Sequence, residues 1–416
     1  DVTFQGSVDL RDVERELTIN TSGSVIDTAD ARFKIDALVI DSNGNSNSLG
    51  TAVNPLSINV TNLEVYGGSG GIYVDESDDL NVNTPISAGG GNVSLKAIGK
   101  VTVVEVTAGD LTIDAGDVEL KGSIDASTVT LMTSNPIDLG TETSGSFSLT
   151  PIEVNRIDNG TTFIETTDTS SGLTSAITVS KPISTSDNVN LKLTAGGNMT
   201  FAADVTMTNK AVTLDAGGGI GGNGTITAAT LDATADSGIN LTTSVGTLIF
   251  NNTGTGTDTV IVNTGSLSLT ASGSGNAGNV DLTTAGNLTL AGIFVSSGDI
   301  TVATSDANGV GTNNTEISIP SGAEIKTLGG SVTLAADRMD LSGDISATVG
   351  VTLQAALNDD IRLGGTSTNP VSLELSMDEL NRIDADVINI GKNNGGKITI
   401  SETISPAHAL TLNLIT

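Results

Sequence analysis

The sequence predicts an all-β chain that folds as a right-handed parallel β-helix, or β-solenoid, with about 18–20 residues in each coil. Three observations predict this fold class. Apolar residues recur with period two, turn residues separate the apolar pairs, and the whole unit returns at a nearly constant interval. All three are clearest in residues 279–302, which read NVDLTTAGNLTLAGIFVSSGDITV.

Four short apolar pairs in residues 279–302 predict four strands. Within each pair the residues are two positions apart, so both point to the same face of a strand. The pairs are Val280/Leu282, Leu288/Leu290, Ile293/Val295 and Ile300/Val302. Gly, Asn and Ser between them are turn residues, which predict the corners of a coil. We therefore expect each pair, Leu290 included, to point into a shared apolar core.

The interval between equivalent apolar residues is nearly constant along the chain. Leu282 is followed by Ile300 and Leu334 by Leu353, and both intervals are about 18–19 residues. At this interval, 416 residues predict about 20 coils. Helices are disfavoured because Gly-Gly and Asn-Gly interrupt the apolar runs throughout, while Thr, Val and Ile favour strands. Ordinary hairpins are disfavoured because the connections are Ala-Gly-Gly or Ser-Gly-Asp rather than two-residue turns.

Composition also favours a repeat array over ordinary globular domains. Gly accounts for 50 residues and aromatic residues for 2%, while Trp and Cys are absent, which argues against a bulky globular core and excludes disulfides. The formal net charge of −31 argues against nucleic acid and anionic membrane surfaces as partners. No apolar run is long enough to span a bilayer. The acidic surface, poor in aromatic residues, predicts no dedicated ligand pocket.

The strand rhythm divides the chain into two predicted regions. Residues 1–55 form a less regular β region with surface loops, and residues 56–416 form a continuous solenoid. The solenoid holds a duplicated module, at about 137–360 and 361–416, of which the second copy is truncated. Because Asp1 follows no leader and the chain ends on a strand-like segment, we expect it to be a piece of a longer protein.

The duplication shows as a shared motif that ends in Asn-Arg-Ile. The interval from Arg156 to Arg382 is two positions longer than the interval from Leu139 to Leu363, so the copies differ by a short insertion or deletion in a loop. We expect both arginines to be structural, each paired with a nearby acid.

This motif resembles a known family. Leu-Asn-Arg-Ile-Asp-Ala at 380–385 and Val-Ile-Asn-Ile-Gly at 387–391 are similar to recurring units of large bacterial exoproteins. So are AGGNMTF at 195–201 and LDAGGGIGGNGTI at 214–226. These exoproteins are filamentous-haemagglutinin-like, two-partner-secretion adhesins with β-strand repeats, and the resemblance covers most of residues 56–416. Their motifs identify an architecture rather than a catalytic or binding site.

The resemblance implies a structural rod segment of a large secreted adhesin or surface filament. Such a protein acts outside the cell or on the bacterial cell surface, in attachment or in biofilm and extracellular matrix formation. The expected partners are further copies of the chain in a filament and, for the full-length protein, an outer-membrane secretion partner. The residues do not identify the host, cell-surface or matrix ligand.

The densest acidic cluster is Asp75-Glu-Ser-Asp-Asp79. Oxygen-rich loops bind Ca²⁺ when several carboxylates converge, so Asp75, Glu76, Asp78 and Asp79 are the candidate metal ligands. The cluster lacks the Asp-x-Asp-x-Asp-Gly spacing of a dedicated calcium loop, and a solvated turn is the alternative. No other cofactor is expected. Two weaker acidic pairs are Asp359-Asp360 and Asp378-Glu379.

The sequence predicts that the chain is not an enzyme. His408 is the only histidine and no Gly-x-Ser-x-Gly motif accompanies it, so we expect an exposed loop residue rather than a catalytic base. The glycines at 217–224 lack the Lys and the helix of a phosphate-binding loop. Two alternatives stay open: a subunit of a self-assembling fibre or surface layer, and, less favoured for want of aromatic residues, a β-helical polysaccharide lyase or hydrolase.

Overall fold

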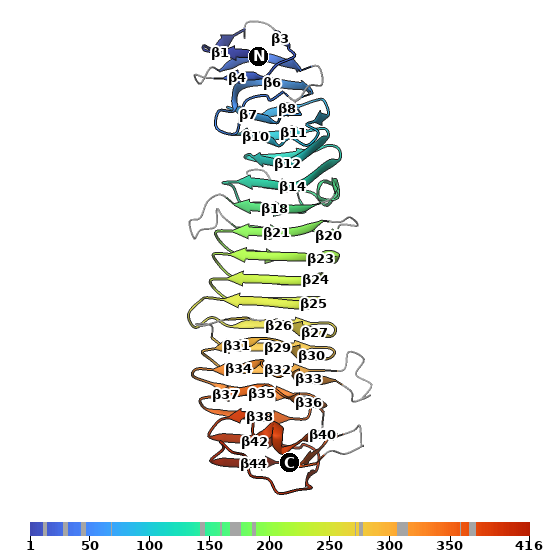
Figure 1. Ribbon diagram of the computed structural model, residues 1–416, viewed down its shortest axis with the longest axis vertical. Helices are drawn as coiled ribbons and strands as arrows, with labels where there is room; N and C mark the ends of the chain where they lie inside the picture. The colour runs from blue at the N-terminus through green and yellow to red at the C-terminus, as the bar shows by residue number, and fades with distance from the viewer. Residues whose placement is uncertain are drawn as a thin grey trace. The chain divides into compact units, whose positions relative to one another are not determined.

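The computed structural model describes the chain except residues 11–14, 28–31, 43–46, 68, 142–145, 159, 167–175, 185–188, 271, 274–277, 306–314, 358 and 366–371. It confirms the predicted fold class, with 61% of residues in strands, 2% in helices, and parallel strands stacked in a β-solenoid of about 17 turns. The chain divides into two compact units, Asp1–Lys210 and Ala211–Thr416, which are described separately (Figure 1).

Among its described residues the first unit contains 22 complete strands, the start of another, and one short helix. They are β1 (Val2–Phe4), β2 (Val8–Asp9), β3 (Glu16–Asn20), β4 (Val25–Asp27), β5 (Phe33–Asp41), β6 (Leu56–Tyr66), β7 (Ile72–Glu76), β8 (Leu80–Val82), β9 (Ile86–Ser87), β10 (Val93–Ala97), β11 (Lys100–Val103), β12 (Val106–Asp114), β13 (Asp117–Leu120), β14 (Ile124–Thr133), β15 (Ile137–Leu139), β16 (Phe147–Leu149), α1 (Pro151–Val154), β17 (Ile157–Asp158), β18 (Thr161–Thr166), β19 (Ile177–Val179), β20 (Ile183–Ser184), β21 (Asn190–Ala195), β22 (Met199–Phe201) and β23 (Val205–Ala216).

The second unit is built from the same kinds of element. They are β24 (Ile220–Ala235), β25 (Ile239–Asn252), β26 (Thr259–Asn263), β27 (Leu267–Leu269), β28 (Ser272–Gly273), β29 (Val280–Thr284), β30 (Leu288–Leu290), β31 (Ile293–Ser296), β32 (Ile300–Thr304), β33 (Glu316–Ile319), β34 (Glu324–Thr327), β35 (Ser331–Ala335), β36 (Arg338–Leu341), β37 (Asp344–Ala347), β38 (Gly350–Gln354), β39 (Asp360–Leu363), β40 (Ser372–Leu375), α2 (Met377–Leu380), β41 (Ile383–Asp384), β42 (Val387–Gly391), β43 (Ile398–Ile400) and β44 (Thr411–Ile415).

Strands of successive coils pair in parallel and in register, which produces continuous columns of like residues. In the first unit Val93 pairs with Leu111, which pairs in turn with Val129 on the coil that follows. The residues two positions further along each strand form a second buried column. Its members in β7, β10, β12, β14, β18 and β21 are Val74, Leu95, Ile113, Leu131, Ile164 and Leu193, none more than 1% exposed.

Several coils are much longer than the predicted 18–20 residues, which is one reason why about 17 turns are found where about 20 were predicted. Val129 pairs with Thr162, well beyond the length of an ordinary coil, because β15, β16 and α1 are inserted between them. In the second unit Val351 pairs with Ile388, around β39, β40 and α2. Val302 likewise pairs with Leu334, although only β33 and β34 lie between their strands, so the predicted period also fails in a coil without such an insert.

The two inserts have the same local structure. In each one a pair of parallel strands precedes a single helical turn: Leu139 pairs with Leu149, and Leu363 pairs with Leu375. The second connection is longer than the first by two positions, so the length difference between the copies lies here. The N–H of Gly140 donates to Leu149 and that of Gly364 to Leu375, which closes both connections alike. The origin of both inserts by duplication remains a prediction.

The burial pattern of residues 279–302 confirms the prediction except at one strand. Val280, Leu282, Leu288 and Leu290 are buried, as expected. In β31, however, Val295 is half-buried and the next residue, Ser296, is fully buried. The prediction that Val295 points into the core was therefore wrong. The side chain of Ile293 lies outside the described residues. The prediction failed because three apolar residues run together at 293–295, and such a run does not specify which alternate positions face inward.

Buried polar side chains occupy corners of the second unit. Asn263 is 1% exposed, and its Oδ1 accepts from the Thr243 hydroxyl and the Val245 N–H, both at 2.9 Å. Its Nδ2 donates to the carbonyls of Val245 and Gly265 at 3.3 and 3.0 Å. Asn252 is likewise buried and bonded through both ends of its amide. These amides satisfy backbone groups that turn away from the strand ladder at the corners.

Residues 1–55 contribute strands that pair like those of later coils. β3 pairs with β5 and β5 with β6, all in parallel. Phe4 and Phe33 meet edge to face, with ring centroids 4.5 Å apart, and Phe33 is 1% exposed. Parts of the predicted charged excursion at 9–16 and of the polar loop at 41–48 lie outside the described residues. The boundary predicted at residue 55 stays a prediction.

Candidate functional site

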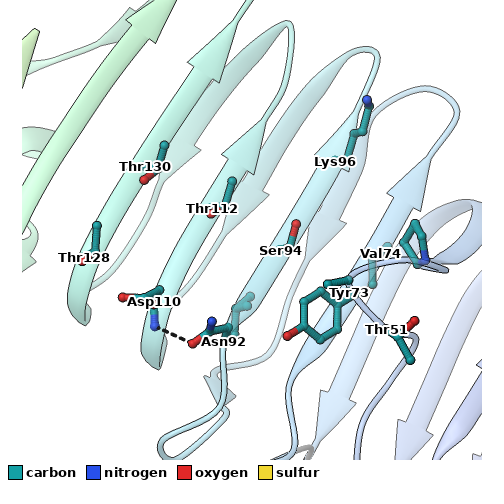
Figure 2. A pocket seen from close by; sticks show the side chains of 13 residues that line it. Thr51, Tyr73, Val74, Asn92, Ser94, Lys96, Asp110, Thr112, Thr128 and Thr130 are labelled. Carbon is teal, nitrogen blue, oxygen red and sulfur yellow. Dashed lines mark hydrogen bonds between the residues drawn. The ribbon is translucent and has the colours of Figure 1, made fainter. Parts of the chain in front are cut away.

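A groove of about 500 Å³ lies on the outer face of the first unit, over β7, β10, β12 and β14 (Figure 2). The prediction that the surface has no dedicated ligand pocket stays a prediction, since a hollow alone does not show that a ligand binds there. Six of its lining side chains carry a hydroxyl group, and these are Thr51, Tyr73, Ser94, Thr112, Thr128 and Thr130. The others that line it are Ala52, Pro55, Val74, Asn92, Val93, Lys96 and Asp110. We call this surface the hydroxyl groove.

Strand register brings the hydroxyl groups into a line across the strands. Tyr73 pairs with Ser94, Ser94 with Thr112, and Thr112 with Thr130. Because the neighbouring residues on each strand point into the core, these four side chains point outward. Figure 2 shows them following one another from strand to strand. Within the described part of the chain their hydroxyl groups make no hydrogen bond, so they are available to a ligand.

A turn over residues 51–54 forms a lip beside Tyr73. Gly50 has a φ of +67°, a left-handed conformation that a side chain would strain, and it starts the turn. The Thr51 N–H donates to the Asn54 carbonyl at 2.8 Å and closes it. A Cβ placed on Gly71 would lie 2.8 Å from the Tyr73 ring, so the missing side chain at Gly71 leaves room for the ring. The lip and the Tyr73 ring therefore form the boundary of the groove at one end.

The groove carries little free charge. Lys96 is its one cation among the lining residues, and its Nζ lies 3.4 Å from the Asp114 carboxylate. Asp75 neighbours Lys96 in the strand register on the other side. Asp110 adds a carboxylate at the edge, where its N–H donates to the Asn92 side-chain oxygen at 3.2 Å (Figure 2). An anionic ligand would thus meet a carboxylate and a lysine that already has an ion-pair partner.

The structure separates the acids of the predicted calcium site. Glu76 is fully buried, Asp75 is half-buried on the strand, and Asp78 and Asp79 are exposed. The Asp78 carboxylate accepts from the Asn59 amide at 3.0 Å, and the Asp79 carboxylate accepts from the Lys100 N–H at 2.7 Å. Nowhere among the described residues do three or more His, Asp or Glu side chains gather in a way that suits a metal ion. The calcium site remains a prediction.

The Glu76 carboxylate instead fills a corner of its coil. It accepts from the N–H groups of Val60 at 2.8 Å and Ser77 at 2.6 Å, and more distantly from Asp78 at 3.3 Å. Burial raises the pKa of Glu76 to about 7, and the nearby Asp78 charge raises it further. The backbone hydrogen bonds act in the opposite direction and lower this pKa. The acidic run itself does not distinguish Glu76 from the other acids. Glu76 follows Ile72 and Val74 at alternate positions of one strand, however, and this spacing points its side chain inward.

We expect the free energy of unfolding to fall as the pH rises from about 4.5 to about 7. The folded chain holds the Glu76 proton more tightly than the unfolded chain, whose pKa is near 4.5, so deprotonation in this window favours unfolding. The slope from this one group is at most about 1.4 kcal/mol per pH unit.

Urea titrations at several pH values, compared between the parent chain and Glu76→Gln, measure this contribution. The difference between the two curves should depend on pH in that window, because Gln does not titrate. Glu105→Gln, the same change at an exposed glutamate of the first unit, is the matched control. A constant difference between the parent chain and Glu76→Gln across the window would contradict the raised pKa.

Glu153 and Glu379 have the same structural role in the two inserts. In α1 the Glu153 Oε2 accepts from the N–H and the hydroxyl of Thr150, both at 2.8 Å, and its Oε1 accepts from the Leu120 N–H at 3.0 Å. In α2 Glu379 makes the same two bonds to Ser376 at 2.8 Å and a third to the Leu341 N–H. Each carboxylate therefore caps its own helix and the end of a strand in a neighbouring segment.

The matching arginines differ in their partners. Arg382 forms the predicted pair with an acid, since its Nη1 lies 3.4 Å from the Asp344 carboxylate. Arg156 instead donates to the backbone carbonyl of Leu120. Both are structural, as predicted, but the prediction of an acid partner is correct only for Arg382.

The remaining candidates from the sequence do not form a site. His408 is exposed, as predicted. A second hollow of about 450 Å³ includes Asp378 and Glu379, but Glu379 is engaged in the capping bonds described above. Asp360 accepts from the Lys397 N–H at 2.9 Å, which is a strand-end contact. Neither weaker acidic pair thus presents two carboxylates free to bind one cation.

Comparison with protein-family models, with curated proteins and with solved structures finds no match to the chain. The parallel β-solenoid is compatible with a β-helical repeat protein. None of the described helices has the length and apolar character needed to cross a bilayer.

Proposed function

We propose that the chain is a structural segment of a secreted bacterial adhesin or surface filament, which spaces the attaching parts of a longer protein from the cell. The observation that supports this proposal is the unbroken buried column in the second unit. It runs through β26, β29, β32, β35, β38 and β42, and its members are Ile261, Leu282, Val302, Leu334, Leu353 and Ile390, none more than 1% exposed.

A column of this kind gives each coil the same interface to the next. Stability then grows roughly in proportion to the number of coils, so length can change without a new core. This property suits a spacer, for which the number of stacked coils matters more than any one side chain. The secreted location, the outer-membrane secretion partner and a role in biofilm or matrix formation belong to the same proposal, through the resemblance to two-partner-secretion adhesins.

The spacer role can be tested in cells that display the longer protein. Deletion of Ala211–Thr416 should reduce attachment at equal surface amounts, and insertion of an unrelated β-solenoid with the same number of coils should restore it. Failure of the unrelated solenoid to restore attachment would contradict a spacer role. Ordered polymers of the purified chain under the electron microscope would favour the fibre subunit. Polysaccharide turnover that a single Asp substitution abolishes would favour the lyase or hydrolase.

A further inference from the structure

We propose that the hydroxyl groove of the first unit binds an uncharged polysaccharide, laid across strands β7, β10, β12 and β14. This proposal does not depend on the spacer role. It starts from the chemistry of the lining residues, which is hydroxyl-rich, nearly free of unpaired positive charge, and bordered by an aromatic ring.

The spacing of the hydroxyl groups suits a ligand with polar groups at regular intervals. Tyr73, Ser94, Thr112 and Thr130 stand on successive coils, so neighbouring members are separated by roughly 4.8 Å and the four span roughly 15 Å. A polysaccharide offers hydroxyl groups that both donate and accept, as Ser and Thr hydroxyls do. The Asn92 amide and the Asp110 carboxylate add further polar partners along one edge.

Aromatic rings border this line at both ends. Tyr73 stands at one end beside the lip, and Phe163 continues the same register beyond Thr130. The Phe163 ring lies 5.5 Å from the Lys192 ammonium, a contact that helps to hold its position. The chain has only 2% aromatic residues, so two of them on one outward column are a concentration of the apolar surfaces on which sugar rings stack.

Charge favours an uncharged glycan over an acidic one. Lys96 is already paired with Asp114, and Asp110 would repel a carboxylate or sulfate group. The formal charge of −31 on the whole chain acts in the same direction. An acidic polysaccharide would therefore be excluded at low ionic strength, whereas an uncharged one would not.

Affinity gel electrophoresis of the full 416-residue chain tests the proposal. The gels contain amylose, dextran, a β-1,3-glucan, mannan or xylan as uncharged probes, and alginate or hyaluronate as acidic ones. We expect at least one uncharged polysaccharide to retard migration and neither acidic one to do so. Tyr73→Ala should weaken that binding by at least about tenfold, since it removes the aromatic border.

Matched variants distinguish recognition from loss of structure. Thr112→Val keeps the side-chain shape and removes one hydroxyl, so it should weaken binding severalfold while circular dichroism and the thermal midpoint stay unchanged. Thr333→Val makes the same change on the outward face of β35 in the second unit and should bind like the parent chain. If Tyr73→Ala does not fold, the binding of Thr112→Val and Ser94→Ala shows whether the hydroxyl groove recognises the polysaccharide.

Three results would overturn the proposal. One is that no uncharged probe retards the chain. Another is that an acidic probe binds better than every uncharged one. The third is that folded Thr112→Val and Ser94→Ala bind as tightly as the parent chain and the Thr333→Val control.

Discussion

Replacing Leu290 with Asp is expected to lower the free energy of unfolding of the second unit by about 3–5 kcal/mol, because a carboxylate would be buried there without a partner. Leu290 is 2% exposed, and the residue paired with it on the preceding coil is Leu269, which is also 2% exposed. A buried charge between apolar neighbours has no cation and no hydrogen-bond donor to offset the loss of its hydration. Urea titration followed by circular dichroism measures the change.

Thr289→Asp is the matched control for this substitution. Thr289 lies between Leu288 and Leu290 on the same strand, but it points outward, so the same carboxylate stays in water and should change stability by less than about 1 kcal/mol. Hydrogen exchange of β27 and β30 should accelerate first in Leu290→Asp, since each coil contacts only its neighbours. Equal unfolding midpoints for the two variants would mean that Leu290 does not point into the core.

Replacing Glu153 or Glu379 with Ala is expected to cost about 2–4 kcal/mol at either insert. Each change removes three hydrogen bonds, and Glu153→Ala also leaves the Leu120 N–H without its acceptor at a buried position. The loss should be similar in the two units, since the bonds of Glu379 match those of Glu153. Thermal and urea unfolding of both variants provide the measurement.

The second insert contains its own control. Asp378 is exposed and precedes Glu379 in the same helical turn, so Asp378→Ala changes the charge and the helix propensity without removing a capping bond. It should cost less than about 1 kcal/mol. If Glu379→Ala costs no more than Asp378→Ala, the capping bonds do not stabilise the insert.

Much of the fold could be predicted from the sequence because every coil repeats one simple pattern. Alternating pairs such as Val280/Leu282 specify both the strand and its buried face, and turn residues specify the corners. The pattern was uninformative where apolar residues are consecutive, as at Ile293–Val295, and where an insert lengthens a coil. The inserts did have a local signal, since Thr150-x-x-Glu153 and Ser376-x-x-Glu379 are capping boxes that predict a helix start.

The candidate site could not be predicted because it depends on which strands become neighbours. Tyr73 and Thr130 are separated by several strands and turns in the sequence, and only the register of β7, β10, β12 and β14 places them on one outward line. The low aromatic content predicted a surface without a dedicated pocket. Composition contains no information on where the few aromatic residues lie in space. The acidic cluster shows the reverse relation between sequence and space: its residues are adjacent in sequence, but alternation along the strand turns Glu76 inward and leaves Asp75 outside.

The buried amides of Asn252 and Asn263 have a consequence for how such a chain finds its fold. Coils with the same apolar columns are nearly interchangeable, so a slip by one whole coil would bury almost the same hydrophobic surface. A slipped chain, however, would place the Asn263 amide opposite different corner groups and deprive it of the three bonds that it makes to Thr243 and Val245 on the preceding coil. The cost of an unsatisfied buried amide then falls on the mispaired state alone. Residues that add little to the core can in this way distinguish one coil from the next, and so direct each strand to its correct neighbour during folding.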